Sequence, residues 1–215
     1  MTNRLLLSGA LLSVLFGQSA DAGLVSGTSS TFGIHLPADP LTDPSLSGRA
    51  LAGGSINVST IFAFNERQSL RLATNLVLDT GGMIAANTWI SSHYLLFDPS
   101  TNNLEPSGRL VFDYPILGVI RTSASLAATD ALLGVVGATY GTRDGSGLEG
   151  NDIVTWTGNQ LTFSFRTNQV GDHLRIITAA PAVNVVQEPH SNAVWAGCAA
   201  IGMLFWRIGR RQMRA

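Results

Sequence analysis

The chain has 215 residues, enough for one domain with a hydrophobic core but too few for two full domains once both terminal segments are set aside. Only 13% of the residues are charged, every basic residue is arginine, and eight arginines face twelve acidic residues between Gly23 and Val186, so no basic surface for nucleic acid is expected there. The single cysteine, Cys198, lies in a C-terminal apolar stretch, which excludes a disulfide, a cysteine–zinc site and a cysteine nucleophile from the domain before it.

The N-terminus has the three zones of a secretory signal peptide. Arg4 supplies positive charge, Leu5 to Phe16 form an apolar run, and the small residues Ala20 and Ala22 stand where a signal peptidase needs them. We therefore predict a signal peptide over residues 1–22, with Gly23 as the new N-terminus. A retained membrane anchor is the alternative, but the apolar run is well short of the ~20 residues that span a bilayer.

Residues 23–183 are predicted to form one all-β ectodomain. Gly, Ser, Thr and Asn are abundant, and apolar stretches of strand length are separated by turn residues at the spacing of a sandwich or barrel. The predicted strands are Ser55–Phe64, Ser69–Asp79, Ser91–Phe97, Gly108–Tyr114, Ile116–Thr122, Asp152–Thr157, Gln160–Arg166 and His173–Ala179. One short helix is predicted over Ser125–Leu133. We expect an antiparallel β-sandwich, jelly-roll-like in its connectivity.

The dipeptide Gly158-Asn159 predicts a two-residue hairpin turn, because glycine accepts a positive φ at the first central position. In the resulting register Thr157 pairs with Gln160, and every second residue of the hairpin faces the same way. The apolar face then contains Val154, Trp156, Leu161, Phe163 and Phe165. Trp156 is therefore expected in the core. Trp89 is the better candidate for an exposed aromatic that stacks on a sugar ring, although burial is the more common fate of such a residue.

A glycine-rich connection contains four oxygen-bearing side chains: Asp144, Ser146, Glu149 and Asp152. Calcium is the cation that such a loop suits, because it prefers oxygen ligands and tolerates irregular geometry. The spacing does not match an EF-hand loop, and a solvated connection whose glycines serve turn geometry is the alternative. No other cofactor is expected.

The remaining residues predict no catalytic site. His35, His93 and His173 are far apart in the sequence, and each is expected to be a polar side chain at a sheet or loop surface. No hydrolase or metalloprotease motif is present in the domain. We assign no catalytic residue, and expect a protein that is not an enzyme.

The C-terminal segment, residues 184–215, has three parts in a fixed order. Gln187-Glu188-Pro189 is followed by an apolar run from Ala193 to Trp206. A basic cluster then ends the chain: Arg207, Arg210, Arg211 and Arg214. A helix of this run is marginal in length for a ~30 Å hydrocarbon core, and the arginines favour a cytoplasmic C-terminus.

This tail resembles the PEP-CTERM sorting signal, in which a Pro-Glu-Pro motif precedes a short transmembrane helix and an arginine cluster. Glu188 and Pro189 match the motif, whereas Gln187 stands where the family usually has proline. The resemblance implies a Gram-negative bacterium that makes exopolysaccharide, and an exosortase that recognises and cleaves the tail. A permanent tail anchor is the alternative.

Together these features favour a noncatalytic protein of the cell surface or extracellular matrix. It would be exported, held by its tail at the inner membrane facing the periplasm, and then processed by an exosortase. The expected partners are the exosortase and inner-membrane lipid. The alternative function is a lectin-like module that binds exopolysaccharide, with or without the assistance of calcium.

Overall fold

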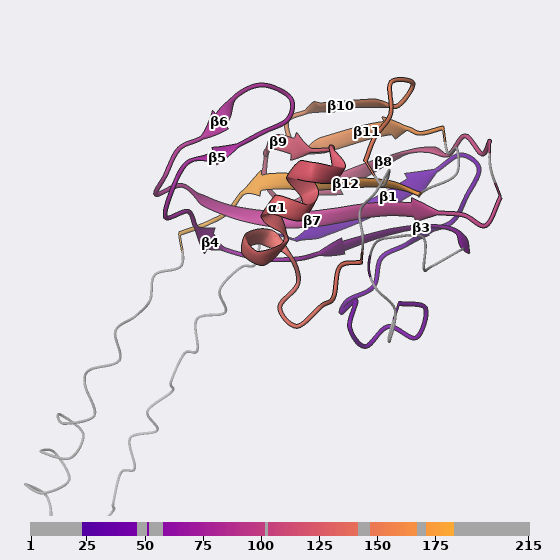
Figure 1. Cartoon of the computed structure of the whole chain (residues 1–215), viewed down its shortest axis with the longest axis horizontal. Coiled ribbons are helices and arrows are strands. Elements are labelled where there is room, and N and C mark those ends of the chain that lie inside the picture. The colour runs from indigo at the N-terminus through magenta and orange to yellow at the C-terminus, as the bar shows by residue number, and fades with distance from the viewer. Residues whose placement is uncertain are drawn as a thin grey trace, which may run out of the picture. The chain divides into compact units, whose positions relative to one another are not determined.

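The computed structural model describes residues 23–46, 51, 58–101, 103–141, 147–166 and 171–182. Over these ranges the chain forms β-strands and one α-helix (Figure 1). The elements in chain order are β1 (Leu24–Ser29), β2 (Ile34–His35), β3 (Val58–Asn65), β4 (Leu70–Arg71), β5 (Leu76–Val77), β6 (Met83–Ile84), β7 (Trp89–Asp98), β8 (Ser107–Phe112), β9 (Ile116–Ile120), α1 (Ser123–Leu133), β10 (Ile153–Thr157), β11 (Gln160–Ser164) and β12 (Asp172–Ala179).

Two sheets face each other across an apolar core. The smaller sheet has four strands in the order β1-β8-β11-β10, and all its pairs are antiparallel. The larger sheet has six strands, with β2-β3-β7-β12-β9 in order and β4 beside β7. Side chains of both sheets share one buried cluster, to which the larger sheet contributes Leu95, Phe97 and Leu174 and the smaller sheet contributes Leu110, Phe112 and Phe163. The predicted all-β class with an antiparallel, sandwich-like arrangement and one helix is confirmed.

The central strands β7 and β12 of the larger sheet are buried on both faces. A second apolar cluster, which includes Tyr94 of β7 and Leu126 and Leu133 of α1, covers the side away from the smaller sheet. In Figure 1 α1 lies in front of the strands of the larger sheet. The consequence is that β7 is buried along almost its whole length, while β12 is buried from Asp172 to Thr178. Successive side chains of these two strands point into two different apolar layers.

The helix begins at Ser123, two residues before the predicted start, and Thr122 is its N-cap. Thr122 has extended backbone and its side chain accepts a hydrogen bond from the Ser125 backbone N–H, as expected for an N-cap threonine. Asp79 Oδ2 accepts hydrogen bonds of 2.7 Å from the backbone N–H groups of both Arg121 and Thr122. The carboxylate of Asp79 therefore fixes the junction between β9 and α1.

The hairpin of β10 and β11 has the predicted register. Thr157 pairs with Gln160, Trp156 with Leu161, and Gly158 has a φ of +58° at the first turn position. Leu161 and Phe163 are buried as expected, and Trp156 faces the same core but is only partly buried.

The predicted strands are confirmed with small shifts of their ends, except for Ser69–Asp79. That stretch divides into β4, which pairs with β7, and β5, which pairs with β6. The strands β1, β2 and β6 were not predicted. Among the residues that the structure describes, no helix is long and apolar enough to cross a membrane. The predicted signal peptide and sorting tail lie outside the described residues.

Candidate functional site

Three carboxylates come together where β12 begins. Glu149 and Asp152 belong to the connection before β10, and Asp172 is the first residue of β12. One carboxylate oxygen from each residue lies within 4.8 Å of the other two. The sequence placed Glu149 and Asp152 in a candidate cation site, and the structure confirms that these two are close. Asp144 and Ser146, the other two candidates, lie outside the described residues.

Asp152 holds the connection in place with its side chain. Its Oδ1 accepts a 2.7 Å hydrogen bond from the backbone N–H of Arg166, just beyond β11, and its Oδ2 accepts one from the backbone N–H of Glu149. The backbone N–H of Leu148 bonds to the Arg121 carbonyl at 2.8 Å, which ties the same connection to the end of β9. The position of the Asp152 carboxylate is thus set by the backbone around it.

Asp172 differs from its two neighbours because it is completely buried. Its exposed fraction is 0%, and neither carboxylate oxygen has a hydrogen-bond partner within the described residues. Gly171, directly before it, packs so closely on β7 that an added Cβ would lie 2.7 Å from the Phe97 carbonyl oxygen and 2.8 Å from Asp98 Cα. Burial raises the pKa of Asp172 to about 8, and the charges of Asp152 and Glu149 add to the shift.

The sequence analysis missed Asp172. Its position at the head of the apolar strand His173–Ala179 was a signal, since a buried strand rarely begins with an unpaired carboxylate. Only the sheet register, which pairs Asp172 with Phe97, brings the residue to the acidic connection. The cluster joins two segments that are separated by β10 and β11, and sequence spacing alone does not reveal such a contact.

A second polar cluster lies between the larger sheet and α1. The Arg175 guanidinium donates from Nε and Nη2 to the two oxygens of Glu66, at 2.6 and 2.7 Å. Its remaining donors reach Asp130, Thr129 and the Leu126 carbonyl on α1. Burial by itself lowers the pKa of Arg175, but the Glu66 carboxylate and its hydrogen bonds raise it well above its usual value. All five N–H groups of Arg175 are therefore satisfied inside the protein.

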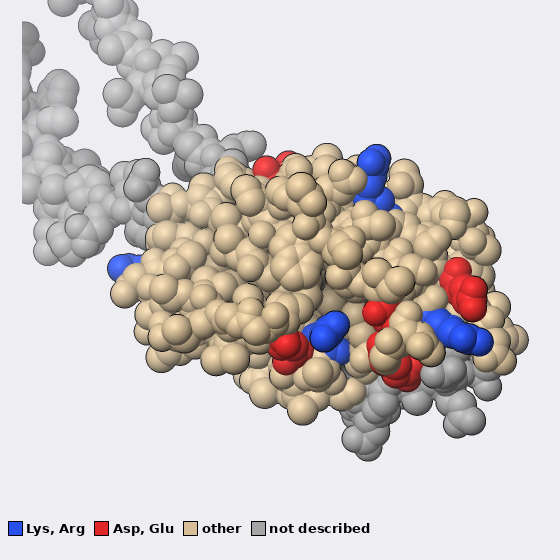
Figure 2. Space-filling view, turned by 90° about the horizontal axis from the view of Figure 1, so that it is seen from above, with Lys and Arg blue, Asp and Glu red and all other residues tan. Residues whose placement is uncertain are grey.

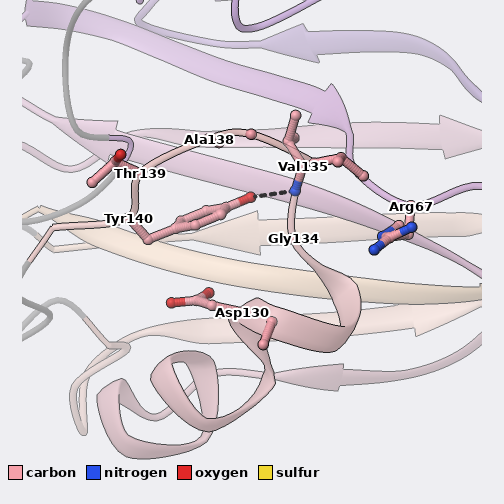
Figure 3. A pocket seen from close by; sticks show the side chains of 10 residues that line it. Arg67, Asp130, Gly134, Val135, Ala138, Thr139 and Tyr140 are labelled. Carbon is pink, nitrogen blue, oxygen red and sulfur yellow. Dashed lines mark hydrogen bonds between the residues drawn. The ribbon is translucent and has the colours of Figure 1, made fainter.

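A hollow of about 490 Å³ adjoins this cluster at the C-terminal end of α1 (Figure 3). Its lining includes Arg67, Asp130, Thr139 and Tyr140. The Tyr140 hydroxyl accepts a 3.0 Å hydrogen bond from the backbone N–H of Val135 and donates to Glu66. Burial raises the pKa of Tyr140 far above its ordinary value, with the Glu66 charge adding to the effect. Tyr140 thus lines the hollow, while its hydroxyl is hydrogen-bonded to Val135 and Glu66 within the protein.

The prediction that all three histidines lie at the surface is wrong for two of them. His93 is 1% exposed and bonds to Asn65 and Thr178, and burial lowers its pKa to about 3. His173 is 0% exposed, and its Nδ1 lies 3.0 Å from the Tyr94 hydroxyl. Both lie on strands of the larger sheet, which is covered on two sides. His35 is partly exposed and pairs with Asp43 at 2.7 Å.

Other candidate residues are placed as follows. Trp89, the proposed exposed aromatic, is only partly buried, at the start of β7. The signal-cleavage, sorting and membrane-orienting residues lie outside the described residues: Ala20, Ala22, Gln187, Glu188, Pro189, Arg207, Arg210, Arg211 and Arg214. The face shown in Figure 2 is largely uncharged; toward its lower right acidic and arginine side chains lie near one another, whereas other arginine side chains stand apart.

No known protein family, curated protein or solved structure matches this chain.

Proposed function

We propose that this protein is a noncatalytic component of the cell surface or extracellular matrix, exported through its signal peptide and sorted through its PEP-CTERM-like tail. The observation that carries the proposal is the order of segments in the sequence. An N-terminal apolar run with a small-residue cleavage site precedes the β-rich domain, and Glu188-Pro189, an apolar run and four arginines follow it.

The described domain is compatible with a binding or structural role outside the cell. It has a core of two apolar clusters and uses no cysteine, so it needs neither a disulfide nor a reducing compartment. Beneath α1, Glu66 accepts hydrogen bonds from both Arg175 and Tyr140. The jelly-roll-like connectivity stays a prediction.

In this proposal the tail holds the domain at the inner membrane, facing the periplasm, until an exosortase cleaves near Glu188-Pro189. Pro189 cannot continue a helix from upstream and restricts Glu188 to extended backbone, the conformation that a protease cleft binds. The four arginines orient the apolar run through anionic cytoplasmic lipid, at about 1 kcal/mol for each charge near the surface. The motif and the arginines therefore serve separable steps, cleavage and retention.

A second candidate function, binding of exopolysaccharide, is favoured by one feature of the smaller sheet. A hollow of about 490 Å³ on this sheet combines the apolar residues Ile153 and Phe163 with hydroxyl side chains, among them Thr28, Ser107, Thr162 and Ser164. Arg109, which pairs with Thr28 on one side and Thr162 on the other, stands in the same hollow. Hydroxyls with one guanidinium suit the hydrogen bonding of an acidic sugar chain.

The test of the proposed function separates cleavage from retention. The wild type, a Glu188→Ala/Pro189→Ala variant and a variant with the four arginines changed to glutamine are expressed with and without an exosortase. His190→Ala is the matched control beside the motif. Mass spectrometry reads both ends of the mature chain, and fractionation gives its partition between membrane and medium.

We expect the wild type and the control to begin at Gly23 and to lose Ala193–Trp206 only when the exosortase is present. The motif variant should keep its tail in the membrane, and the arginine variant should be retained less well. A wild-type chain that keeps the apolar run in the presence of the exosortase would show that the tail is a permanent anchor. A wild-type chain that still carries Leu5–Phe16 would refute export through a cleaved signal peptide.

A further inference from the structure

The carboxylate of Asp172 is buried without a hydrogen-bond partner among the described residues. A buried polar side chain is normally hydrogen-bonded, because removing it from water without a partner costs several kcal/mol for a charged group. Asp172 is 0% exposed and both of its oxygens lack a partner among the described residues. A bound ligand would therefore satisfy the buried carboxylate of Asp172.

Protonation of Asp172 would not remove the electrostatic repulsion among the carboxylates around it. Its carboxylate lies beside those of Glu149 and Asp152, and one oxygen from each of the three falls within 4.8 Å of the others. A proton on Asp172 would remove its own charge but would leave the Glu149 and Asp152 carboxylates facing each other. A divalent cation instead attracts all three groups at once.

The geometry suits a large, oxygen-binding cation. Calcium binds oxygen at 2.3–2.6 Å, so ligand atoms on opposite sides of one calcium ion are separated by about 5 Å. The three oxygens of the cluster fit within that span without movement of the chain. Magnesium is smaller, requires a near-octahedral arrangement and dehydrates reluctantly, so three carboxylates on a loop and a strand suit it less well.

The second shell is also in place. The two oxygens of Asp152 each accept a backbone hydrogen bond, from Glu149 and from Arg166, which orients the carboxylate and leaves lone pairs for a metal. The Nε of Arg166 lies 3.6 Å from Glu105 in an exposed pair, so this guanidinium has an acidic partner outside the cluster.

We propose that Glu149, Asp152 and Asp172 form a calcium-binding site that clips the connection before β10 to the first residue of β12. The buried Asp172 is the ligand from the core of the sandwich, and Glu149 and Asp152 are the ligands from the surface. The site does not involve the sorting tail. A failure to bind calcium would therefore leave the proposed function untouched, and a failure of the proposed function would leave the calcium site untouched.

The test uses the full chain in detergent, stripped with EDTA and dialysed. Isothermal titration calorimetry with calcium chloride measures the affinity, and thermal unfolding is followed in EDTA, calcium chloride and magnesium chloride. Asp172→Asn removes the buried charge with little change of shape. Glu105→Gln is the matched control, because it removes an exposed acid that contacts Arg166 at the edge of the same region.

For the wild type we expect a dissociation constant in the range of extracellular calcium modules, about 10⁻⁴–10⁻³ M. At calcium about ten times that constant, the unfolding midpoint should rise by about 3–5 °C, and by less in magnesium. Asp172→Asn should bind calcium at least tenfold more weakly and lose the shift. Its midpoint in EDTA should equal or exceed that of the wild type, which also shows that the variant is folded.

Four results would overturn the proposal. The first is a wild type with neither heat of binding nor a calcium-dependent shift. The second is an Asp172→Asn variant that keeps the wild-type affinity. The third is a Glu105→Gln variant that loses binding to the same extent, which would indicate general attraction to acidic surface. An equal or larger shift in magnesium would refute the choice of calcium.

Discussion

Arg175 of β12 and Glu66, the residue after β3, form a bidentate ion pair in which both side chains are 0% exposed, with N···O distances of 2.6 and 2.7 Å. The same guanidinium contacts Asp130 at 2.9 Å on α1. The Arg175 side chain thus connects β12 and the end of β3 to α1, the helix that covers the larger sheet. The strength of this connection can be measured.

We expect Arg175→Met to lower the free energy of unfolding by about 3–5 kcal/mol, because it leaves the Glu66 carboxylate buried without its counter-charge. The double variant Arg175→Met/Glu66→Gln should recover part of that loss, since no uncompensated charge remains. Urea unfolding of the singles and the double measures both effects.

The control for this prediction is the pair Arg166–Glu105, whose side chains are 51% and 68% exposed. Changing both residues to glutamine should alter the free energy of unfolding by about 0–1 kcal/mol. If Arg175→Met cost no more than this control, the buried pair would contribute little to stability and α1 would be held by its apolar contacts alone.

The dependence of stability on pH should reveal Asp172. Its pKa is raised to about 8, mainly by burial and then by Asp152 and Glu149, against about 3.9 in an unfolded chain. Between these values the folded protein keeps a proton that the unfolded chain has lost, so the contribution of Asp172 to stability falls as pH rises. His93 acts in the opposite sense. Its pKa is lowered to about 3 by burial, so its contribution falls as pH drops below about 6.5.

In calcium-free buffer these two effects oppose each other between about pH 4 and 6.5, and only that of Asp172 remains from about pH 6.5 to 8. We expect the wild type to lose stability over that upper window, by up to about 1.4 kcal/mol for each pH unit. Asp172→Asn should abolish this loss and expose the His93 effect below pH 6.5. Urea midpoints measured from pH 4 to 9 test this, and a variant that kept the upper slope would show that another group titrates there.

The hairpin of β10 and β11 allows burial to be compared on one face. Phe163 is 1% exposed and stacks on Phe165 with ring centroids 4.9 Å apart, whereas Trp156 is only partly buried on the same face. Phe163→Ala should cost about 3–5 kcal/mol and Trp156→Ala less, about 1–3 kcal/mol.

Thr155→Ala, on the opposite and exposed face, is the control and should stay within about 0.5 kcal/mol of the wild type. Denaturant unfolding of the three variants gives the order directly. If Trp156→Ala matched the Thr155 control, its ring would contribute little to the core and would be available as a platform for a sugar.

The sequence by itself determined the local features of this domain. Alternation of apolar residues and the turn preference of Gly158 depend only on neighbours along the chain, and they predicted the hairpin register from Thr157 and Gln160 inward. The short helix was predicted for the same reason, by periodicity within about three turns.

Only the tertiary structure determines which side chains of the larger sheet are buried between two layers and which carboxylates lie close together. His93 and His173 are typical surface residues by composition, yet the packing of α1 and the smaller sheet on opposite faces of the larger sheet buries them. Arg175 and Glu66 are 109 positions apart, and Asp172 reaches Glu149 and Asp152 only through the pairing of β12 with β7. Contacts of this range depend on sheet order, and sheet order depends on how all the strands pack together rather than on any one segment.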